Sequence, residues 1–240
     1  MHERKEMALF VIADTHLSES SEKPMTVFGY RWNGWTERLC ENWKNTVSEN
    51  DTVIIPGDIS WAMTLDEALA DLKLLDGLPG TKIISKGNHD YWWNTLKKNE
   101  EFYKANGITT VKHLYNNSYE VEDVILCGCR GWYYDEKNAP ENADYAKIVA
   151  REAGRLERSL KSAEVFGEGK RKLVFFHFPP VFGTFVCREL IDVMHKYGVT
   201  ECFYGHIHGK YDAPFESEYE GITLRIISAD YLEFNPYRIN

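Results

Sequence analysis

The sequence has few cysteines, and they do not form a disulfide framework. Five cysteines occur among 240 residues, an odd number without regular spacing: Cys40, Cys127, Cys129, Cys187 and Cys202. Disulfides are therefore not implied, and a reducing cytoplasm is the simplest expected location. Cys127 and Cys129 are two apart in a strand-like run, so they should share one face of a strand. We expect them to be small buried side chains rather than a reactive pair.

Long apolar runs are also absent. None approaches the roughly 20 residues that a membrane-crossing helix needs. The apolar stretch 7–13 follows a basic start, but it is at the short limit for a signal segment and runs directly into Asp14. Cleavage there would remove a strand that carries a candidate ligand. We expect neither a membrane span nor a cleaved leader.

A basic track is missing as well. The formal net charge is −9 at pH 7, whereas a protein that binds a long nucleic acid needs a series of Lys and Arg contacts to phosphates. No linker, repeat or low-complexity segment divides the chain. With 43% hydrophobic residues the chain can bury a sizeable core, and we expect a single domain over residues 1–240. The sequence does not indicate an oligomeric state.

What the sequence does contain is a set of strand-like apolar runs that end in metal-ligand residue types. The runs are 9–13, 52–56, 82–86, 173–176 and 202–204. Because strand ends in an α/β protein share one edge of a sheet, groups far apart in sequence can converge there in one crevice. The candidate ligands that follow the runs are Asp14, His16, Asp58, Asn88, His177, His206 and His208.

The donor set indicates two metal ions. Asp, Asn and His without cysteine suit Mn, Fe or Zn better than metals that demand thiolate. Seven ligands are too many for one ion, since a catalytic zinc uses three protein ligands. They divide between two ions if one carboxylate bridges, which is the arrangement that clamps the oxygens of a phosphoryl group. We expect two divalent ions, Mn first and Fe or Zn as alternatives, with Asp58 as the bridge.

Spacing offers further support. In extended backbone, residues two apart point the same way, so Asp14 and His16 are expected to face one side, and so are His206 and His208. A glycine stands directly before three of the candidate ligands. Glycine tolerates unusual backbone angles and close approach, which a turn that carries ligands often requires. These glycines are Gly57, Gly87 and Gly205.

At these residues the chain resembles the calcineurin-like metallophosphoesterase superfamily, as a small, bacterial-type, single-domain member. The superfamily pattern reads D-x-H, G-D, G-N-H-[D/E], H and G-H-x-H, and all five blocks occur in order between residues 14 and 208. The resemblance implies a four-layer sandwich of two mixed β-sheets flanked by helices, with the active site at the carboxyl ends of the strands. It implies one metal on Asp14, His16, Asp58 and His208, and the other on Asp58, Asn88, His177 and His206.

The implied activity is that of a dinuclear-metal-dependent phosphoesterase. Such an enzyme hydrolyses a small phosphate mono- or diester by attack of a metal-bridging hydroxide. His89 would lie beside the metals without binding them, where it can stabilise a phosphoryl oxygen or protonate the leaving group. Asp90 is either an acceptor that holds a ligand imidazole or the N-cap of a following turn. His113 belongs to no block and is expected to be structural.

Two departures narrow the substrate. Protein serine/threonine phosphatases extend the second block to G-D-x-x-D-R-G, whereas residues 57–63 here read GDISWAM, so a phosphoprotein substrate is not expected. Purple acid phosphatases have a Tyr ligand where this chain has Trp61. An indole cannot serve as an anionic oxygen ligand, so an iron–tyrosinate centre is not expected.

Several features suggest how a substrate is held. The long excursion 17–35 has the length of a lid or binding loop. Trp61 and Trp92 follow the second and third blocks, where they favour contact with a planar group such as a base; ordinary core packing is the alternative for each ring. Arg130 can clamp a phosphate bidentately or be a solvated surface residue. We expect a small phosphorylated partner, nucleotide-like molecules included.

The remaining pattern alternates between helices and strands. Periodicity predicts helices over 35–48, 65–75, 95–105, 143–163 and 188–197. Strand-like runs between 109 and 129 and at 222–228 add β structure, and composition alone indicates an α/β class. Three other functions compete with the phosphoesterase. A nuclease on the same centre would need a basic groove, and a non-catalytic binding or adaptor protein should have replaced ligands. A zinc peptidase would need a block such as H-E-x-x-H, which is absent.

Overall fold

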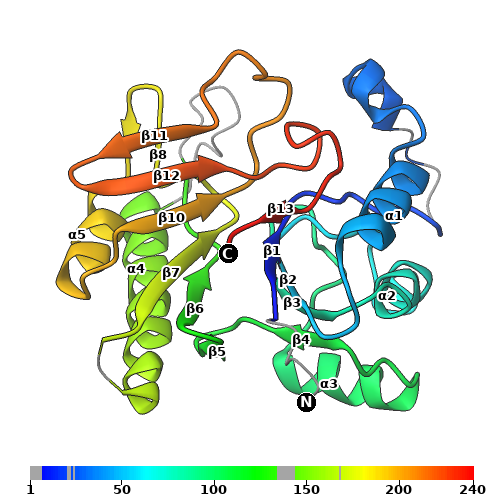
Figure 1. Cartoon of the computed structure of the whole chain (residues 1–240), viewed down its shortest axis with the longest axis horizontal. Coiled ribbons are helices and arrows are strands. Elements are labelled where there is room, and N and C mark those ends of the chain that lie inside the picture. Colours follow the sequence, from blue (N-terminus) through cyan, green and yellow to red (C-terminus); the bar gives the residue numbers. More distant parts are fainter. Residues whose placement is uncertain (1–6, 21–22, 24, 134–143, 168) are drawn as a thin grey trace, which may run out of the picture.

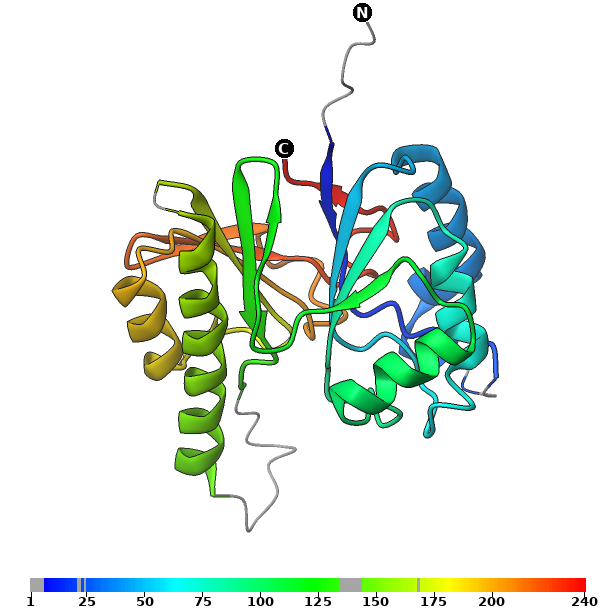
Figure 2. The same cartoon turned by 90° about the horizontal axis from the view of Figure 1, so that it is seen from below.

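The computed structural model describes residues 7–20, 23, 25–133, 144–167 and 169–240. Two mixed β-sheets face each other and helices cover both outer sides, so that the molecule has four layers (Figure 1). The view in Figure 2 separates α1, α2 and α3 on one flank from α4 and α5 on the other. This is the α/β sandwich that the sequence predicts.

The first sheet has the strand order β13-β1-β2-β3-β4. Its strands β1 to β4 run parallel to their neighbours, and β13 closes the edge antiparallel to β1. The helices α1, α2 and α3 connect these strands and cover the outer face of the sheet (Figure 2). The bounds are β1 Leu9–Val11, α1 Trp35–Thr46, β2 Thr52–Pro56, α2 Leu69–Asp76, β3 Thr81–Ser85, α3 Leu96–Ala105, β4 Val111–His113 and β13 Tyr237–Arg238.

The second sheet has the order β11-β12-β10-β7-β6-β5. Its four central strands are parallel and both edge strands are antiparallel. The bounds are β5 Tyr119–Val121, β6 Val124–Cys129, α4 Tyr145–Ser162, β7 Arg171–Phe176, α5 Arg188–Lys196, β10 Glu201–Tyr204, β11 Glu216–Tyr219 and β12 Ile222–Ile226. Shorter elements are the 3-10 helices η1 Met25–Phe28, η2 Tyr30–Trp32 and η3 Ala163–Phe166, and the hairpin of β8 Val181–Phe182 with β9 Phe185–Val186.

The five predicted helices are all present, and one begins late. α2 starts at Leu69 rather than at residue 65 because the preceding residues form a turn stabilised by their own side chains. The Thr64 hydroxyl accepts from the Glu67 N–H at 3.3 Å, and the Glu67 carboxylate accepts from the Met63 N–H at 2.7 Å. Such local bonds compete with helical ones. The predicted start of α4 at residue 143 lies outside the described residues.

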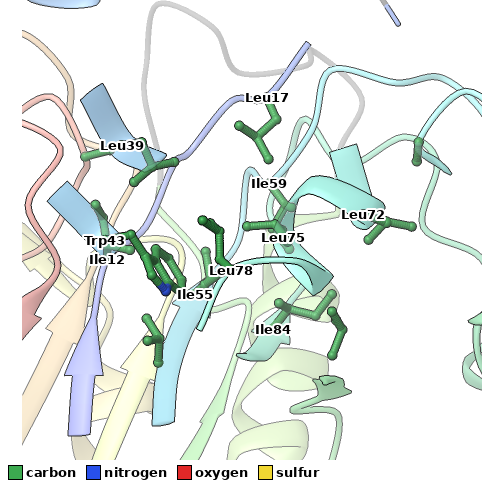
Figure 3. Close-up of a cluster of buried hydrophobic side chains, with 14 of the residues drawn as sticks. Ile12, Leu17, Leu39, Trp43, Ile55, Ile59, Leu72, Leu75, Leu78 and Ile84 are labelled. Carbon is green, nitrogen blue, oxygen red and sulfur yellow. The ribbon is translucent and has the colours of Figure 1, made fainter. Parts of the chain in front are cut away.

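Alternating burial in the strands produces the layers. Leu9 and Val11 belong to the apolar cluster between the two sheets, whereas Phe10 and Ile12 belong to the cluster under α1 and α2. This period of two is the signature of a strand buried on both faces. Each such side chain contributes roughly 1.5–3 kcal/mol through its burial. Figure 3 shows part of the outer cluster, where Ile12, Ile55 and Ile84 of the sheet face Leu39, Trp43, Leu72 and Leu75 of the helices.

The cysteines behave as predicted. All five are unpaired, and Cys127 and Cys129 lie on the same face of β6, in the apolar cluster under α4 and α5. Burial raises the pKa of Cys127 to about 12, so its thiol stays protonated and unreactive at neutral pH. None of the helices described combines the length and apolar character that a membrane crossing requires.

Candidate metal centre

Both sheets contribute to one cluster of polar side chains at the carboxyl ends of their parallel strands. The first sheet places four candidate ligands directly after β1, β2 and β3: Asp14, His16, Asp58 and Asn88. The second sheet places three directly after β7 and β10: His177, His206 and His208. All seven predicted ligands are therefore brought to the same edge of the sandwich.

Backbone bonds join the two sheets below this cluster. The N–H of Ala13 donates to the carbonyl of Ile227 at 2.8 Å, and the N–H of Ala229 donates to the carbonyl of Ala13 at 2.9 Å. This parallel bridge connects the extension of β1 with the extension of β12. Asp14, the next residue, consequently lies at the seam between the sheets.

The candidate ligand atoms form two groups, and within each group all atoms lie within 4.8 Å of one another. The first group is Asp14, His16 and His208, and the second is Asp58, His177 and His206. Asn88 adjoins the second group, because its Oδ1 is 2.6 Å from His177 Nε2. In the first group His16 Nε2 is 3.3 Å from His208 Nε2.

Asp58 lies between the groups. Its Oδ2 is 3.5 Å from His177 Nε2 and 3.7 Å from His16 Nε2, one imidazole from each group. This oxygen and Asp14 Oδ1 are both buried without a hydrogen-bond partner within the described residues. Buried carboxylate oxygens without a partner are costly, and a cation between the groups would satisfy them. The residues present therefore fit a pair of metal ions.

The electrostatics of the centre agree with this fit. Burial raises the pKa of Asp14 to about 6, and burial followed by the charges of Asp90 and Asp14 raises the pKa of Asp58 well above its usual range. Burial also lowers the pKa of His16 and of His177 well below the ordinary value, so these imidazoles are neutral and keep a lone pair. Crowded carboxylates and neutral imidazoles together form a site that favours divalent cations.

Asp230 orients one of the imidazoles. His208 Nδ1 is 2.8 Å from Asp230 Oδ1, and Asp230 Oδ2 accepts from the Gly209 N–H at 3.1 Å and the Tyr211 hydroxyl at 2.9 Å. Burial alone would lower the pKa of His208, but the bond to Asp230 and the charge of Asp14 raise it. A carboxylate on Nδ1 leaves Nε2 for a metal. The sequence reasoning missed Asp230, although it follows the strand-like run 222–228.

Asp90 holds two of the ligand loops together. Its Oδ2 accepts from the backbone N–H groups of Gly87 at 2.8 Å and Asp58 at 2.9 Å. Its Oδ1 accepts from the backbone of Ile59 and Ser60 and from the indole of Trp92. Among the described residues its carboxylate bonds to no ligand imidazole, so that interpretation was wrong. A turn does begin at Asp90, but through its backbone carbonyl, which accepts from the Trp93 N–H at 3.2 Å, and not through a side-chain cap. The Asp90 carboxylate fixes the loop after β2 to the loop after β3.

The ligand backbones are not extended. Asp14, His16, Asp58 and His206 have φ of 59°, 44°, 51° and 69°, in the left-handed region that non-glycine residues rarely adopt. The argument from alternating strand faces was therefore wrong, because tight turns aim these side chains. Such backbone costs on the order of 1–3 kcal/mol per residue and is concentrated at functional sites.

The three predicted glycines are needed where the ligand loops touch. A Cβ on Gly57 would lie 2.7 Å from the Cα of Gly87. A Cβ on Gly87 would collide with the Asp58 carboxylate, and one on Gly205 with the Asp14 carboxylate. Only glycine allows the loops to pack this closely around the centre.

His89 lies beside the centre and outside both ligand groups. Its backbone N–H donates to Asp58 Oδ1 at 2.8 Å. Its ring centroid is 4.4 Å from that of Trp61 and 5.7 Å from that of His16. Burial, with smaller effects from His208 and Lys23, lowers the pKa of His89 to about 4. Its Nδ1 has no partner within the described residues.

The three predicted substrate contacts have different outcomes. Trp61 is partly buried and stacks on His16 at 4.8 Å, so it borders the centre. Trp92 is 1% exposed and its indole N–H donates to Asp90; the prediction that it contacts a substrate was wrong, because core packing covers the ring. Arg130, after β6, is partly buried beside the Phe178 ring at 5.8 Å, and its contact with a substrate stays a prediction.

The excursion after the first block also borders the centre. Trp32, in η2, is fully buried and meets the rings of His16 at 5.8 Å and His208 at 5.6 Å edge-on. Phe28 and Tyr30 next to it are 58% and 77% exposed. The part of the excursion that the structure describes therefore combines an anchor on the ligands with exposed rings.

Comparison with known proteins agrees with this geometry. The sequence model of calcineurin-like phosphoesterases matches residues 7–210. Phosphopantetheinyl hydrolase from Mycobacterium tuberculosis has a similar fold, with a TM-score of 0.53 and 16% identity over 98% of this chain and 96% of that one. Protein TT1561 from Thermus thermophilus is similar with a TM-score of 0.54 and 11% identity over 98% and 99% of the chains. At such low sequence identity, these similarities support a shared fold alone. No curated protein matches the sequence significantly.

Proposed function

This chain belongs to the calcineurin-like phosphoesterase family, and we propose that it hydrolyses a small phosphate mono- or diester with the help of two divalent metal ions. The observation that carries the proposal is the pair of adjoining ligand groups with Asp58 between them. A single-ion site would not need a second complete group. The donor set favours Mn, with Fe or Zn as alternatives.

In this proposal each ion would have four protein ligands. One would be held by Asp14, His16, Asp58 and His208, and the other by Asp58, Asn88, His177 and His206. When bound, the two ions activate a water for attack on phosphorus and neutralise charge on the phosphoryl oxygens. Asp230 and Asp90 keep the ligand side chains and loops in place, since both bond to centre residues without entering the ligand groups.

The protein's own contribution to the chemistry comes from His89 and its neighbours. His89 is partly exposed beside the centre, so a ring N–H can donate to a phosphoryl or leaving-group oxygen. Trp61 packs against both His16 and His89 and so forms part of the wall beside them. These two side chains give the departing group a fixed position relative to the ligands.

The decisive experiment measures metal content and turnover together. Protein reconstituted with Mn²⁺ should contain two ions per chain by elemental mass spectrometry. It should hydrolyse members of a panel of aryl phosphates, aryl phosphodiesters, nucleotides and single-stranded DNA. Asp58→Ala should weaken both sites because it removes the bridge, whereas Asp66→Ala, which removes an exposed carboxylate, should change neither.

Each alternative has its own outcome. One tight site that Asp58→Ala does not weaken would refute the dinuclear centre. Full metal loading without turnover of any ester would identify a binding protein on this fold. Turnover of DNA alone would identify a nuclease.

A further inference from the structure

A second polar cavity lies beside the metal centre. Its volume is about 270 Å³, and four basic residues are part of its wall together with two asparagines. They are Lys86, Arg130, Arg151, Arg155, Asn94 and Asn116. We call this cavity the basic pocket. No carboxylate is among the described residues that line it.

The basic residues reach the pocket from both halves of the sandwich. Lys86 follows β3 of the first sheet, Arg130 follows β6 of the second, and Arg151 and Arg155 are one turn apart on α4. Like charges four residues apart on a helix repel each other and destabilise it slightly. The fold therefore assembles a concentration of positive charge in a chain whose formal net charge is −9.

Nearby negative charge balances only part of this. Glu152, which is fully buried, is 2.6 Å from Arg155 and 3.6 Å from Arg151. Arg130 has a buried Nε without a hydrogen-bond partner within the described residues. Burial lowers the pKa of Arg130, Glu152 opposes this, and Arg155 and Arg151 add to it. Among the described residues, the four basic side chains outnumber the carboxylates that act on them, Glu152 and Asp90, and an anion would relieve this excess of positive charge.

The pocket adjoins the side of the centre formed by Asn88 and His177. Lys86 is two residues from Asn88, so their Cα atoms are at most about 7 Å apart. The carbonyl of Arg130 accepts from the N–H of Phe178 at 2.9 Å, directly after His177. The strand ends that carry the pocket therefore adjoin those that carry the centre.

We propose that the basic pocket binds a second anionic group of the substrate while the scissile phosphoryl group lies at the metal centre. The inference rests on the proposed hydrolysis and makes it more specific: the substrate is a small molecule with two anionic groups, either a bisphosphate or a phosphate ester that also carries a carboxylate. Guanidinium groups bind both kinds of oxyanion bidentately. The asparagine amides can supply further hydrogen bonds.

The test is a comparison of matched substrates with the metal-loaded protein. Linear alkanediol bisphosphates of increasing length and phosphorylated hydroxy acids are each compared with the alkyl monophosphate of equal length. At the best length the second anionic group should raise kcat/KM by about tenfold or more. A higher kcat/KM for the bisphosphates alone would indicate that the pocket binds a phosphate. A higher kcat/KM for the phosphorylated hydroxy acids alone would indicate that it binds a carboxylate. Gains below about threefold at every length in both series would overturn the proposal.

Arg151→Gln is the informative variant. Arg151 is half exposed and is the more distant partner of Glu152, whereas replacing Arg155 would leave the buried Glu152 without its close partner. Arg151→Gln should raise KM for the doubly anionic substrate about tenfold and change KM for its monophosphate partner less than about threefold. Arg158→Gln removes an equal charge from the exposed side of α4, outside the pocket. This control should leave KM unchanged for both substrates. Equal losses on both substrates would contradict a second subsite.

A direct binding measurement separates this proposal from the proposed hydrolysis. Calorimetric titration of chelator-treated protein with inorganic phosphate and with acetate reports the pocket without metal-bound phosphate. Saturable binding of either anion that Arg151→Gln weakens and Arg158→Gln does not would support the pocket even if no ester were hydrolysed. Absence of saturable binding of both anions would overturn it.

Discussion

At the scale of single residues, His89 separates chemistry from metal binding. It contacts the centre through its backbone and its ring but belongs to neither ligand group. We predict that His89→Ala keeps two ions and the fold and loses about 10²–10⁴ in kcat. The loss should be larger for alkyl than for activated aryl esters, because a poor leaving group develops more negative charge on its oxygen and gains more from the His89 hydrogen bond. Metal analysis and turnover of both ester types check this; loss of an ion would reassign His89 as a ligand.

His113 provides a prediction about pH. Its ring stacks on Tyr103 at 4.9 Å and meets Trp93 edge-on at 5.0 Å, and burial lowers its pKa to about 4. Between pH 6.5 and about 4 the unfolded chain binds the proton more tightly than the folded one, so this residue reduces stability as the pH falls. Between pH 7 and pH 5, His113 lowers the free energy of unfolding by about 2 kcal/mol.

His113→Phe should remove this pH-dependent loss of stability, because phenylalanine fills the same space and does not titrate. Urea unfolding of wild type and variant at pH 7 and pH 5 measures it as a difference between the two proteins, in which titration of the other histidines cancels. An equal loss of stability on acidification in both proteins would show that His113 is not the cause.

The convergence of the seven candidate ligands could be predicted, because their residue types and their places after strands are both visible in the sequence. Their role as metal ligands stays a prediction. Sequence reasoning failed where the surroundings of a residue in the folded protein determine its burial or its backbone conformation. Trp92 is buried because the core packs around its ring, and its indole N–H donates to Asp90. The left-handed backbone of Asp14 and His16 follows from turns that only the assembled sheets impose. Asp230 lacked a motif to identify it.

At the scale of elements, the loops after β2 and β3 behave as one unit because Asp90 accepts hydrogen bonds from both. We predict that Asp90→Asn lowers the stability of metal-free protein by about 2–4 kcal/mol, because an amide nitrogen would face N–H donors that then remain unsatisfied. Metal affinity should fall too, since Asp58 and Asn88 lie on these loops. Urea unfolding and Mn²⁺ titration measure both effects, with exposed Asp123→Asn as the control. Unchanged unfolding would contradict the role of Asp90.

The bounds of some elements depend on local sequence, and those of others depend on contacts with distant segments. Periodicity located α3 and α5 to within one residue at each end, because the amphipathic pattern of each helix lies within its own sequence. β13 was not predicted: Tyr237 and Arg238 form a strand only because Val11 and Phe10 offer an unpaired edge. Strands this short have no pattern of their own.

At the scale of the whole molecule, the proposed ions would join the two sheets, because each ligand group contains residues from both. A ligand that binds only the folded state at one hundred times its Kd adds about 2.7 kcal/mol of stability. For a chain of this size we predict a rise in Tm of about 5–10 °C per ion. Differential scanning calorimetry with Mn²⁺ and with chelator tests this, and Asp58→Ala should abolish most of the difference. Equal Tm values under both conditions would contradict metal binding across the seam.

The pairing of β1 with β13 has a consequence for biosynthesis. A ribosome makes residues 9–11 early, and they can pair with β2 soon afterwards, but the other edge of β1 stays open until residues 237–238 have been made. An open apolar edge attracts foreign strands, so the nascent chain passes through a long interval in which chaperone protection matters. Asp230 and the bridge at Ser228 also arrive late. All seven candidate ligands precede these residues in the sequence, so the bonds that join the sheets below the centre can form only after every candidate ligand has been made.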